Sequence, residues 1–234
     1  QFANTFYSWT RDFSSVVYDG THSDKRSDLI TYQSYNEFSR GINSIPSSDA
    51  NYTDNYKHIR RTNLLLQNAE AYAKQEDIKQ YIGEAYFFRA YSYFDLLQLY
   101  GDVIITKKPL DITDPEMKVK RNDRSEVVDL IIDDLNHAVE NLPAFKELTT
   151  EEEGRISKEG AQAFLSRVAL YEGTWQKSRN GNQNTQRSAN LLDIAAKAAR
   201  TVIDAKYGYT FRLFGTDSET KILGDSAQKY MFIL

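Results

Sequence analysis

The sequence predicts a mostly α-helical protein, and three observations support this prediction. Five segments place apolar residues at intervals of three and four, which is the spacing of one face of an α-helix. No segment of comparable length alternates apolar and polar residues as a half-buried strand does. A pattern of small residues before a large aromatic, Gly83-x-Ala85-x-x-Phe88, recurs loosely as Gly160-Ala161-x-Ala163-Phe164. Such recurrence is typical of helical repeats, where small residues let two helices approach closely.

The first 52 residues are the least periodic part of the chain. Aromatic residues spaced by three or four predict a helix near residues 2–17: Phe2, Phe6, Trp9 and Phe13. A turn-rich break follows at Tyr18–Asp24. The segment Tyr32–Asn43 then mixes aromatic rings with amide and charged groups and has no clear helical face. This composition favours a functional loop over a core helix.

The central helix, predicted over Ile82–Asp102, has a broad apolar arc and is expected to be packed on most of its sides. A narrow polar stripe on it comprises Glu84, Tyr91, Asp95 and Gln98. Asp77 and Gln80 resemble a capping box at its start, and Gly101 is placed for a left-handed stop at its end. Arg89 lies inside the apolar arc, and a buried guanidinium requires carboxylate or carbonyl partners. We therefore expect a neighbouring helix to supply a buried partner for Arg89.

Four other segments show helical periodicity, over residues 54–73, 125–142, 157–172 and 188–205. Ser125 is a favourable N-cap for the second of them, and Pro143 stops it. The third begins at Ser157, and Gly173 is expected to end it. The residues expected to face inward in the last two are Ala161, Phe164, Leu165, Val168 and Tyr171, and then Leu191, Ala195, Ala198, Val202 and Ile203.

Composition argues against several classes of function. A net charge of −4 over 234 residues provides no basic field for a phosphate backbone, so nucleic acid is not an expected partner. The absence of cysteine excludes disulfides and thiolate zinc sites. The three histidines are far apart in sequence, and no phosphate-binding glycine loop or nucleophile elbow occurs. The sequence predicts no catalytic, cofactor-binding or metal-binding residues, and therefore not an enzyme.

Five blocks of the chain, within about residues 50–205, resemble the SusD/RagB family of outer-membrane nutrient-binding lipoproteins. The central block reads Gly-Glu-Ala-x-Phe-x-Arg-Ala-x-x-Tyr-Phe-x-Leu-x-x-x-Tyr-Gly-Asp-Val from Gly83. The segment Tyr52–Leu66 is similar to the family helix that ends in an Asn and paired aliphatic residues. Three further blocks, 124–143, 154–161 and 165–175, follow in the family's order. The resemblance implies tetratricopeptide-like helical pairs with irregular ligand-binding loops.

The resemblance also implies where the ligand binds. In this family the stretch between an early Ser-Asp pair, here Ser23-Asp24, and the Tyr-x-x-Ile helix contributes to the ligand site. An aromatic ring of that stretch stacks on a sugar, and a polar side chain bonds its hydroxyl groups. The candidate ligand-binding residues are therefore Tyr32, Tyr35, Asn36, Phe38, Arg40 and Asn43.

By this resemblance the protein captures oligosaccharides at the cell surface and delivers them to a SusC-like TonB-dependent outer-membrane transporter. A lipid on an N-terminal cysteine, which this chain does not contain, would anchor it to the outer membrane. Two alternatives stay open: a peptide-capturing member of the same family, and a helical-repeat adaptor that binds protein. An adaptor would not need the aromatic and polar loop at residues 32–43.

We expect residues 1–234 to form a single α-helical domain that is the N-terminal part of a longer chain. Residues 1–52 would form a loop-rich ligand face, 53–205 a helical-repeat scaffold, and 206–234 the start of the second half. The chain begins at Gln1 with neither Met nor an apolar signal segment, so its true N-terminus is expected to lie upstream. No apolar run approaches the roughly 18–20 residues that a bilayer-spanning helix needs.

Overall fold

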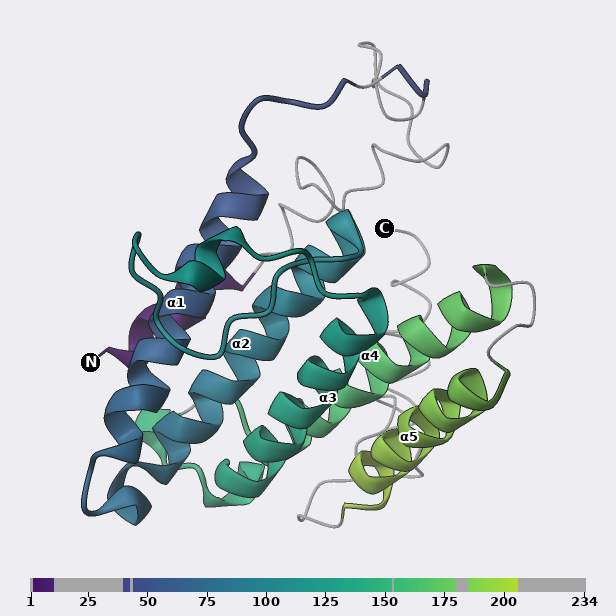
Figure 1. The fold of residues 1–234 in the computed structure, drawn as a ribbon. Coiled ribbons are helices and arrows are strands. Elements are labelled where there is room, and N and C mark those ends of the chain that lie inside the picture. The colour runs from purple at the N-terminus through teal and green to yellow at the C-terminus, as the bar shows by residue number, and fades with distance from the viewer. Residues whose placement is uncertain (1, 11–39, 43, 153, 180–184, 206–234) are drawn as a thin grey trace, which may run out of the picture. The chain divides into compact units, whose positions relative to one another are not determined.

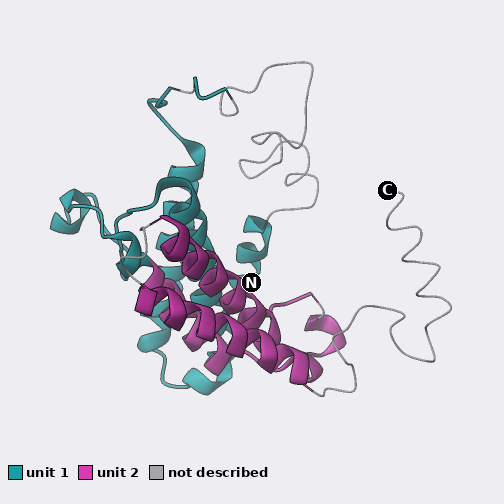
Figure 2. Cartoon of the chain, turned by 90° about the vertical axis from the view of Figure 1, so that its right-hand side faces the viewer, with its two compact units in different colours: residues 1–127 teal, residues 128–234 magenta. Residues whose placement is uncertain are grey.

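The computed structural model describes residues 2–10, 40–42, 44–152, 154–179 and 185–205. These residues are mostly α-helical, and among them only an isolated bridge between Val103 and Asn122 has β-type pairing. The chain divides into two compact units, residues 1–127 and 128–234, shown in teal and magenta in Figure 2. The prediction of a mostly α fold built from helical pairs is confirmed.

Unit 1 is organised around the pair α1 (Ala50–Glu70) and α2 (Lys79–Tyr100), which pack against each other (Figure 1). The 3-10 helix η1 (Ala3–Trp9) packs on both of them. A second 3-10 helix, η4 (Gln75–Ile78), leads directly into α2, and a third, η5 (Pro115–Lys118), lies in the loop that follows α2. Large side chains buried in this unit are Phe6, Ile59, Phe88, Tyr93, Leu96 and Leu97. Burying each stabilises the fold by about 1.5–3 kcal/mol before entropy is counted.

Helix α1 begins four residues earlier than its periodicity predicts, because Asp49 caps it. The Asp49 carboxylate accepts hydrogen bonds from the backbone N–H of Asn51 at 2.9 Å and from the hydroxyl of Tyr100 at 2.7 Å. The Tyr100 hydrogen bond is the main reason that the pKa of Asp49 lies below its usual value. The cap therefore ties the first turn of α1 to the last turn of α2.

Helix α2 ends as predicted and starts differently. Gly101 adopts φ = 71°, and its N–H bonds the carbonyl of Leu97 at 3.0 Å, so the left-handed stop is confirmed. The predicted capping box of Asp77 and Gln80 is wrong. The residue before the helix is Ile78, which makes no side-chain cap, because η4 already supplies a preceding helical turn.

The buried partner expected for Arg89 is also present. Arg89 Nη1 donates a 2.8 Å hydrogen bond to Oδ1 of Asn63 on α1, and the Tyr86 ring lies 5.3 Å from the guanidinium. The amide nitrogen of Asn63 in turn donates to the carbonyls of Thr106 and Lys108 at 3.0 and 3.2 Å. One amide thus joins both helices and the loop that follows them.

Helix α3 (Arg124–Asn141) carries the chain from unit 1 into unit 2, where α4 (Lys158–Arg179) and α5 (Thr185–Asp204) pack closely. Two 3-10 turns, η6 (Phe145–Glu147) and η7 (Thr150–Glu152), connect α3 with α4. The buried apolar residues of these helices include Ile131, Leu135, Ala138, Ala161, Leu165, Val168, Leu191, Ala195 and Ala198. Most of the residues expected to face inward are therefore buried.

Two predictions about unit 2 are wrong. Gly173 does not end α4, which continues to Arg179 with Gly173 buried against α5. A Cβ atom on this residue would lie 3.0 Å from Leu192 Cγ and 3.3 Å from Leu191 Cβ, so the glycine permits close helix packing. Ile203, expected to face inward, is 52% exposed.

Candidate functional site

The structure describes one of the six predicted ligand residues, Arg40. Arg40 is exposed in a turn beside Gly41, whose φ of 67° allows the chain to reverse. The other five predicted residues, Tyr32, Tyr35, Asn36, Phe38 and Asn43, lie outside the described residues.

The two described ends of this region flank one small hollow in unit 1. Trp9 ends η1, before the stretch that holds the predicted residues, and Ala50 starts α1 after it. Both line a hollow of about 190 Å³, together with Asn51, Asp54, Asn55, His58, Tyr91 and Asp95. The elements that precede and follow the predicted loop in the chain, η1 and α1, therefore both contribute to this hollow.

An aromatic wall bounds the hollow. The Trp9 indole stacks on the His58 imidazole with ring centroids 4.1 Å apart and planes within 14°. Phe6 supports the indole from the core, with its centroid 4.6 Å away. Burial lowers the pKa of His58 from 6.5 to about 4, so this imidazole is neutral at pH 7. The stack is thus an uncharged, flat surface beside the hollow.

Amide and carboxylate groups also line the hollow. Asn55 Nδ2 donates to Asp95 Oδ2 at 2.7 Å and to the Asn51 carbonyl at 2.8 Å, which holds α1 against α2. Asp54 pairs with Lys57 at 2.7 Å on the exposed side of α1. An aromatic face beside planar donors and acceptors is the arrangement that a pyranose needs, because its C–H face packs on a ring and its hydroxyls require hydrogen bonds.

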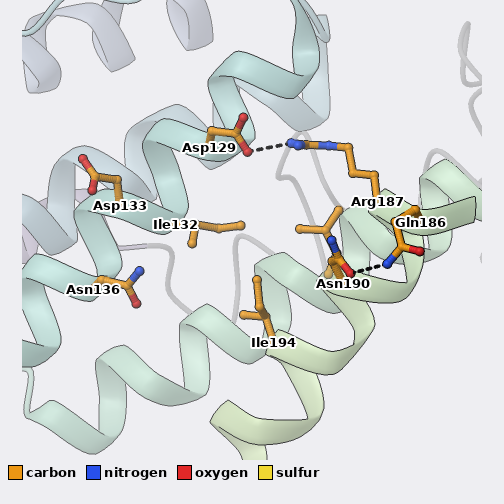
Figure 3. A pocket seen from close by; sticks show the side chains of 9 residues that line it. Asp129, Ile132, Asp133, Asn136, Gln186, Arg187, Asn190 and Ile194 are labelled. Carbon is orange, nitrogen blue, oxygen red and sulfur yellow. Dashed lines mark hydrogen bonds and ion pairs between the residues drawn. The ribbon is translucent and has the colours of Figure 1, made fainter. Parts of the chain in front are cut away.

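A larger hollow, about 620 Å³, lies within unit 2 between α3 and α5 (Figure 3). Asp129 and Arg187 face each other across it at 2.8 Å, and Gln186 bonds Asn190 at 2.8 Å. Its floor consists of isoleucine and leucine, and no aromatic ring lines it. Because no aromatic ring lines it, this hollow suits a sugar less well than the hollow beside Trp9.

Two features are absent from the described part of the chain. No helix there is both long enough and apolar enough to cross a bilayer. No group of three or more histidine, aspartate or glutamate side chains within the same residues is arranged to hold a metal ion.

Comparison with known proteins identifies the family. A family model of SusD-like proteins, described as starch-binding and associating with the outer membrane, matches residues 8–170. The chain belongs to the SusD-like family. The match includes the last two residues of η1, the predicted ligand segment, α1, α2, α3 and the first half of α4.

Individual SusD-like proteins are similar over parts of the chain. SusD-like protein P38 of Formosa agariphila is 32% identical over 133 residues, which is 55% of this chain and 25% of that protein. A SusD-like protein of Bacteroides fragilis superposes with a TM-score of 0.62 and 27% identity, covering 79% of this chain and 32% of that one. A laminarin-binding SusD-like protein superposes with a TM-score of 0.59 and 26% identity, covering 76% and 36%. The chain thus spans a quarter to about a third of the length of these relatives.

Sequence reasoning missed most of the hollow of this SusD-like protein. Tyr91 and Asp95 belong to the polar stripe predicted on the central helix, which was a usable signal. Asn51, Asn55 and His58 recur at intervals of four and three on the neighbouring helix, a second signal of a polar face. No local pattern shows that Trp9 stacks on His58, because 49 positions separate them in the chain.

Proposed function

We propose that this chain is the helical N-terminal part of a cell-surface protein that captures glycans and delivers them to a SusC-like TonB-dependent outer-membrane transporter. The observation that carries the proposal is the match of the SusD-like family model, whose matched range includes both residues 32–43 and the residues that line the hollow beside Trp9. A relative of similar fold that binds laminarin supports a glycan as the ligand. A lipid anchor at the outer membrane is part of the same proposal.

In this proposal the ligand lies where the loop joins the scaffold. Tyr32, Tyr35 and Phe38 offer rings for stacking, and Asn36, Arg40 and Asn43 offer hydrogen bonds to hydroxyl groups. A hollow of about 190 Å³ is smaller than the 300–1,000 Å³ usual for ligand pockets, so the loop completes the site. Residues 1–234 would act as one domain, with 1–52 forming the ligand face, 53–205 the scaffold and 206–234 the beginning of a second half.

In this proposal the protein binds and releases its glycan ligand and catalyses no reaction on it. One or two ring stacks, each worth about 0.5–1.5 kcal/mol beyond the buried area, together with a few hydrogen bonds give modest affinity. Modest affinity serves a protein that must release its ligand to a transporter, because tight binding would slow the transfer.

Calorimetric titration of the intact protein with neutral and acidic oligosaccharides tests this proposal. We expect one glycan class to bind, and Tyr35→Ala to weaken that binding about two- to tenfold, the equivalent of one lost stack. Tyr72→Ala is the matched control, because Tyr72 is an exposed tyrosine of unit 1 that does not line the hollow.

Each outcome of the titration has a distinct meaning. Binding that survives Tyr35→Ala unchanged would retain glycan capture and reject Tyr35 as a ligand residue. Binding of peptides and of no glycan would favour the peptide-capturing alternative. Binding of neither, with a protein partner recovered instead, would favour the helical-repeat adaptor.

A further inference from the structure

A second cleft in unit 1 has a composition suited to a charged ligand. It has a volume of about 450 Å³ and lies between the first three turns of α1 and the loop that follows α2. It is separate from the hollow beside Trp9, with which it shares no lining residue. The residues that line it include Tyr52, Tyr56, Lys57, Arg60, Lys108 and Glu116.

The floor of this cleft is aromatic and held in place. The rings of Tyr52 and Tyr56 lie 4.8 Å apart at an angle of 50°, and Tyr52 meets the edge of Tyr100 at 5.2 Å. The Tyr56 hydroxyl donates to the Ile104 carbonyl at 2.8 Å, which joins the floor to the loop after α2. Burial raises the pKa of Tyr56, so its hydroxyl stays protonated and neutral. Preformed rings reduce the entropy lost when a ligand stacks on them.

Cations outnumber anions among the residues that line the cleft. Lys57, Arg60 and Lys108 contribute three positive charges and Glu116 one negative charge, so the lining itself carries +2. Asp54 and Asp111 do not line the cleft, but they pair with Lys57 and Arg60 and offset this charge. An anionic ligand therefore binds these cations where it replaces a weakly held carboxylate.

The cations that line the cleft differ in how closely a carboxylate partner holds them. Lys57 bonds Asp54 and Lys108 bonds Glu116, both at 2.7 Å. Arg60 lies 3.9 Å from Asp111 and donates to the Leu110 carbonyl at a long 3.4 Å. Its guanidinium can therefore turn to a ligand anion at small cost, and a planar guanidinium binds carboxylate or sulfate through two N–H groups.

We propose that this cleft binds an acidic sugar residue, with the ring on Tyr52 and Tyr56 and its carboxylate or sulfate against Arg60 and Lys57. The inference rests on the proposed glycan capture and specifies the ligand class: a glycan that carries uronate or sulfate groups. The cleft is a subsite additional to the loop at residues 32–43.

Calorimetric titration at low and moderate salt tests the proposal with three probes. These are a neutral β-glucan hexaose, an oligogalacturonate and a sulfated galactan oligosaccharide, the last two of which distinguish carboxylate from sulfate. We expect one acidic probe to bind more tightly than the neutral probe, and its affinity to fall with added salt. The variant Lys57→Gln/Arg60→Gln should weaken that binding about two- to fivefold per charge removed.

The control is Lys79→Gln, which removes the same charge from the same kind of pair. Lys79 bonds Glu76 three residues before it, as Lys57 bonds Asp54, but it does not line the cleft. A second variant, Glu116→Gln, removes the carboxylate that pairs with Lys108 and should tighten binding of the acidic probe. It provides a gain of affinity that misfolding would not produce.

The outcomes separate this inference from the function on which it rests. Neutral binding equal to acidic binding, or equal effects of Lys57→Gln/Arg60→Gln and Lys79→Gln, would overturn the acidic subsite and leave glycan capture intact. No binding of any glycan would overturn both. Acidic binding that Glu116→Gln strengthens and the double variant weakens would support the subsite.

Discussion

Replacing Asn63 with alanine should destabilise unit 1 by about 3 kcal/mol, because this side chain holds three parts of the unit together. It is 1% exposed, and Arg89, whose Nη1 donates to it at 2.8 Å, is 5% exposed. Its amide nitrogen donates to the carbonyls of Thr106 and Lys108. Alanine removes all three hydrogen bonds and leaves no group to replace them.

The magnitude follows from the kind of bond that is lost. A hydrogen bond to a charged group contributes about 1.5–3 kcal/mol, and a buried guanidinium deprived of it keeps its desolvation cost. The amide nitrogen shared by the two loop carbonyls adds about 1 kcal/mol. The sum is about 3 kcal/mol. The Tyr86 ring, 5.3 Å from the guanidinium, stays in place and limits the loss.

Urea denaturation of the full chain at pH 7, followed by far-ultraviolet circular dichroism, measures this free energy. Asn68→Ala on the same helix is the control and should change stability by less than about 0.5 kcal/mol, because Asn68 is exposed. Asn63→Asp should cost less than Asn63→Ala, because it keeps an oxygen for Arg89 and loses only the donors to the loop. A loss below about 1 kcal/mol for Asn63→Ala would refute the reasoning.

Two further predictions concern packing and pH. Gly173→Ala should lower the melting temperature, because its Cβ would lie 3.0 Å from Leu192 Cγ and 3.3 Å from Leu191 Cβ, and overpacking costs about 1–3 kcal/mol. Gly160→Ala should lower it less, because its one close contact, at 2.6 Å, is with the terminal Cδ1 of Ile156, which can rotate away. An unchanged melting temperature for Gly173→Ala would show that α5 can shift. His58 has a folded pKa of about 4 against an ordinary 6.5, so between these values the unfolded chain binds more protons and stability falls as the pH falls. After allowance for solvent around this half-buried group, the free energies of unfolding from urea titrations at pH 7 and 5 should differ by about 1 kcal/mol more in the wild type than in His58→Gln. Equal differences would contradict this.

Local features of the sequence determined the helices of this protein and some of their ends. Apolar spacing of three and four produces a helix wherever a neighbouring surface can cover one face, so the helices around the central motif could be predicted from sequence. Gly101 ends α2 as predicted, because a left-handed residue after a helix favours glycine over any residue with a side chain. The need of Arg89 for a buried partner was predictable from its place in an apolar arc.

Tertiary structure alone decided what those helices bring together. Arg89 needed a carbonyl partner, but only packing selected Asn63, 26 positions away. Gly173 has the composition of a helix stop and is instead a packing contact, which depends on where α5 lies. The stack of Trp9 on His58 and the cationic cleft beside Tyr56 likewise join residues from separate elements. Periodicity reports interactions within four residues, whereas these sites depend on how helices pack, and that information is distributed over the whole chain.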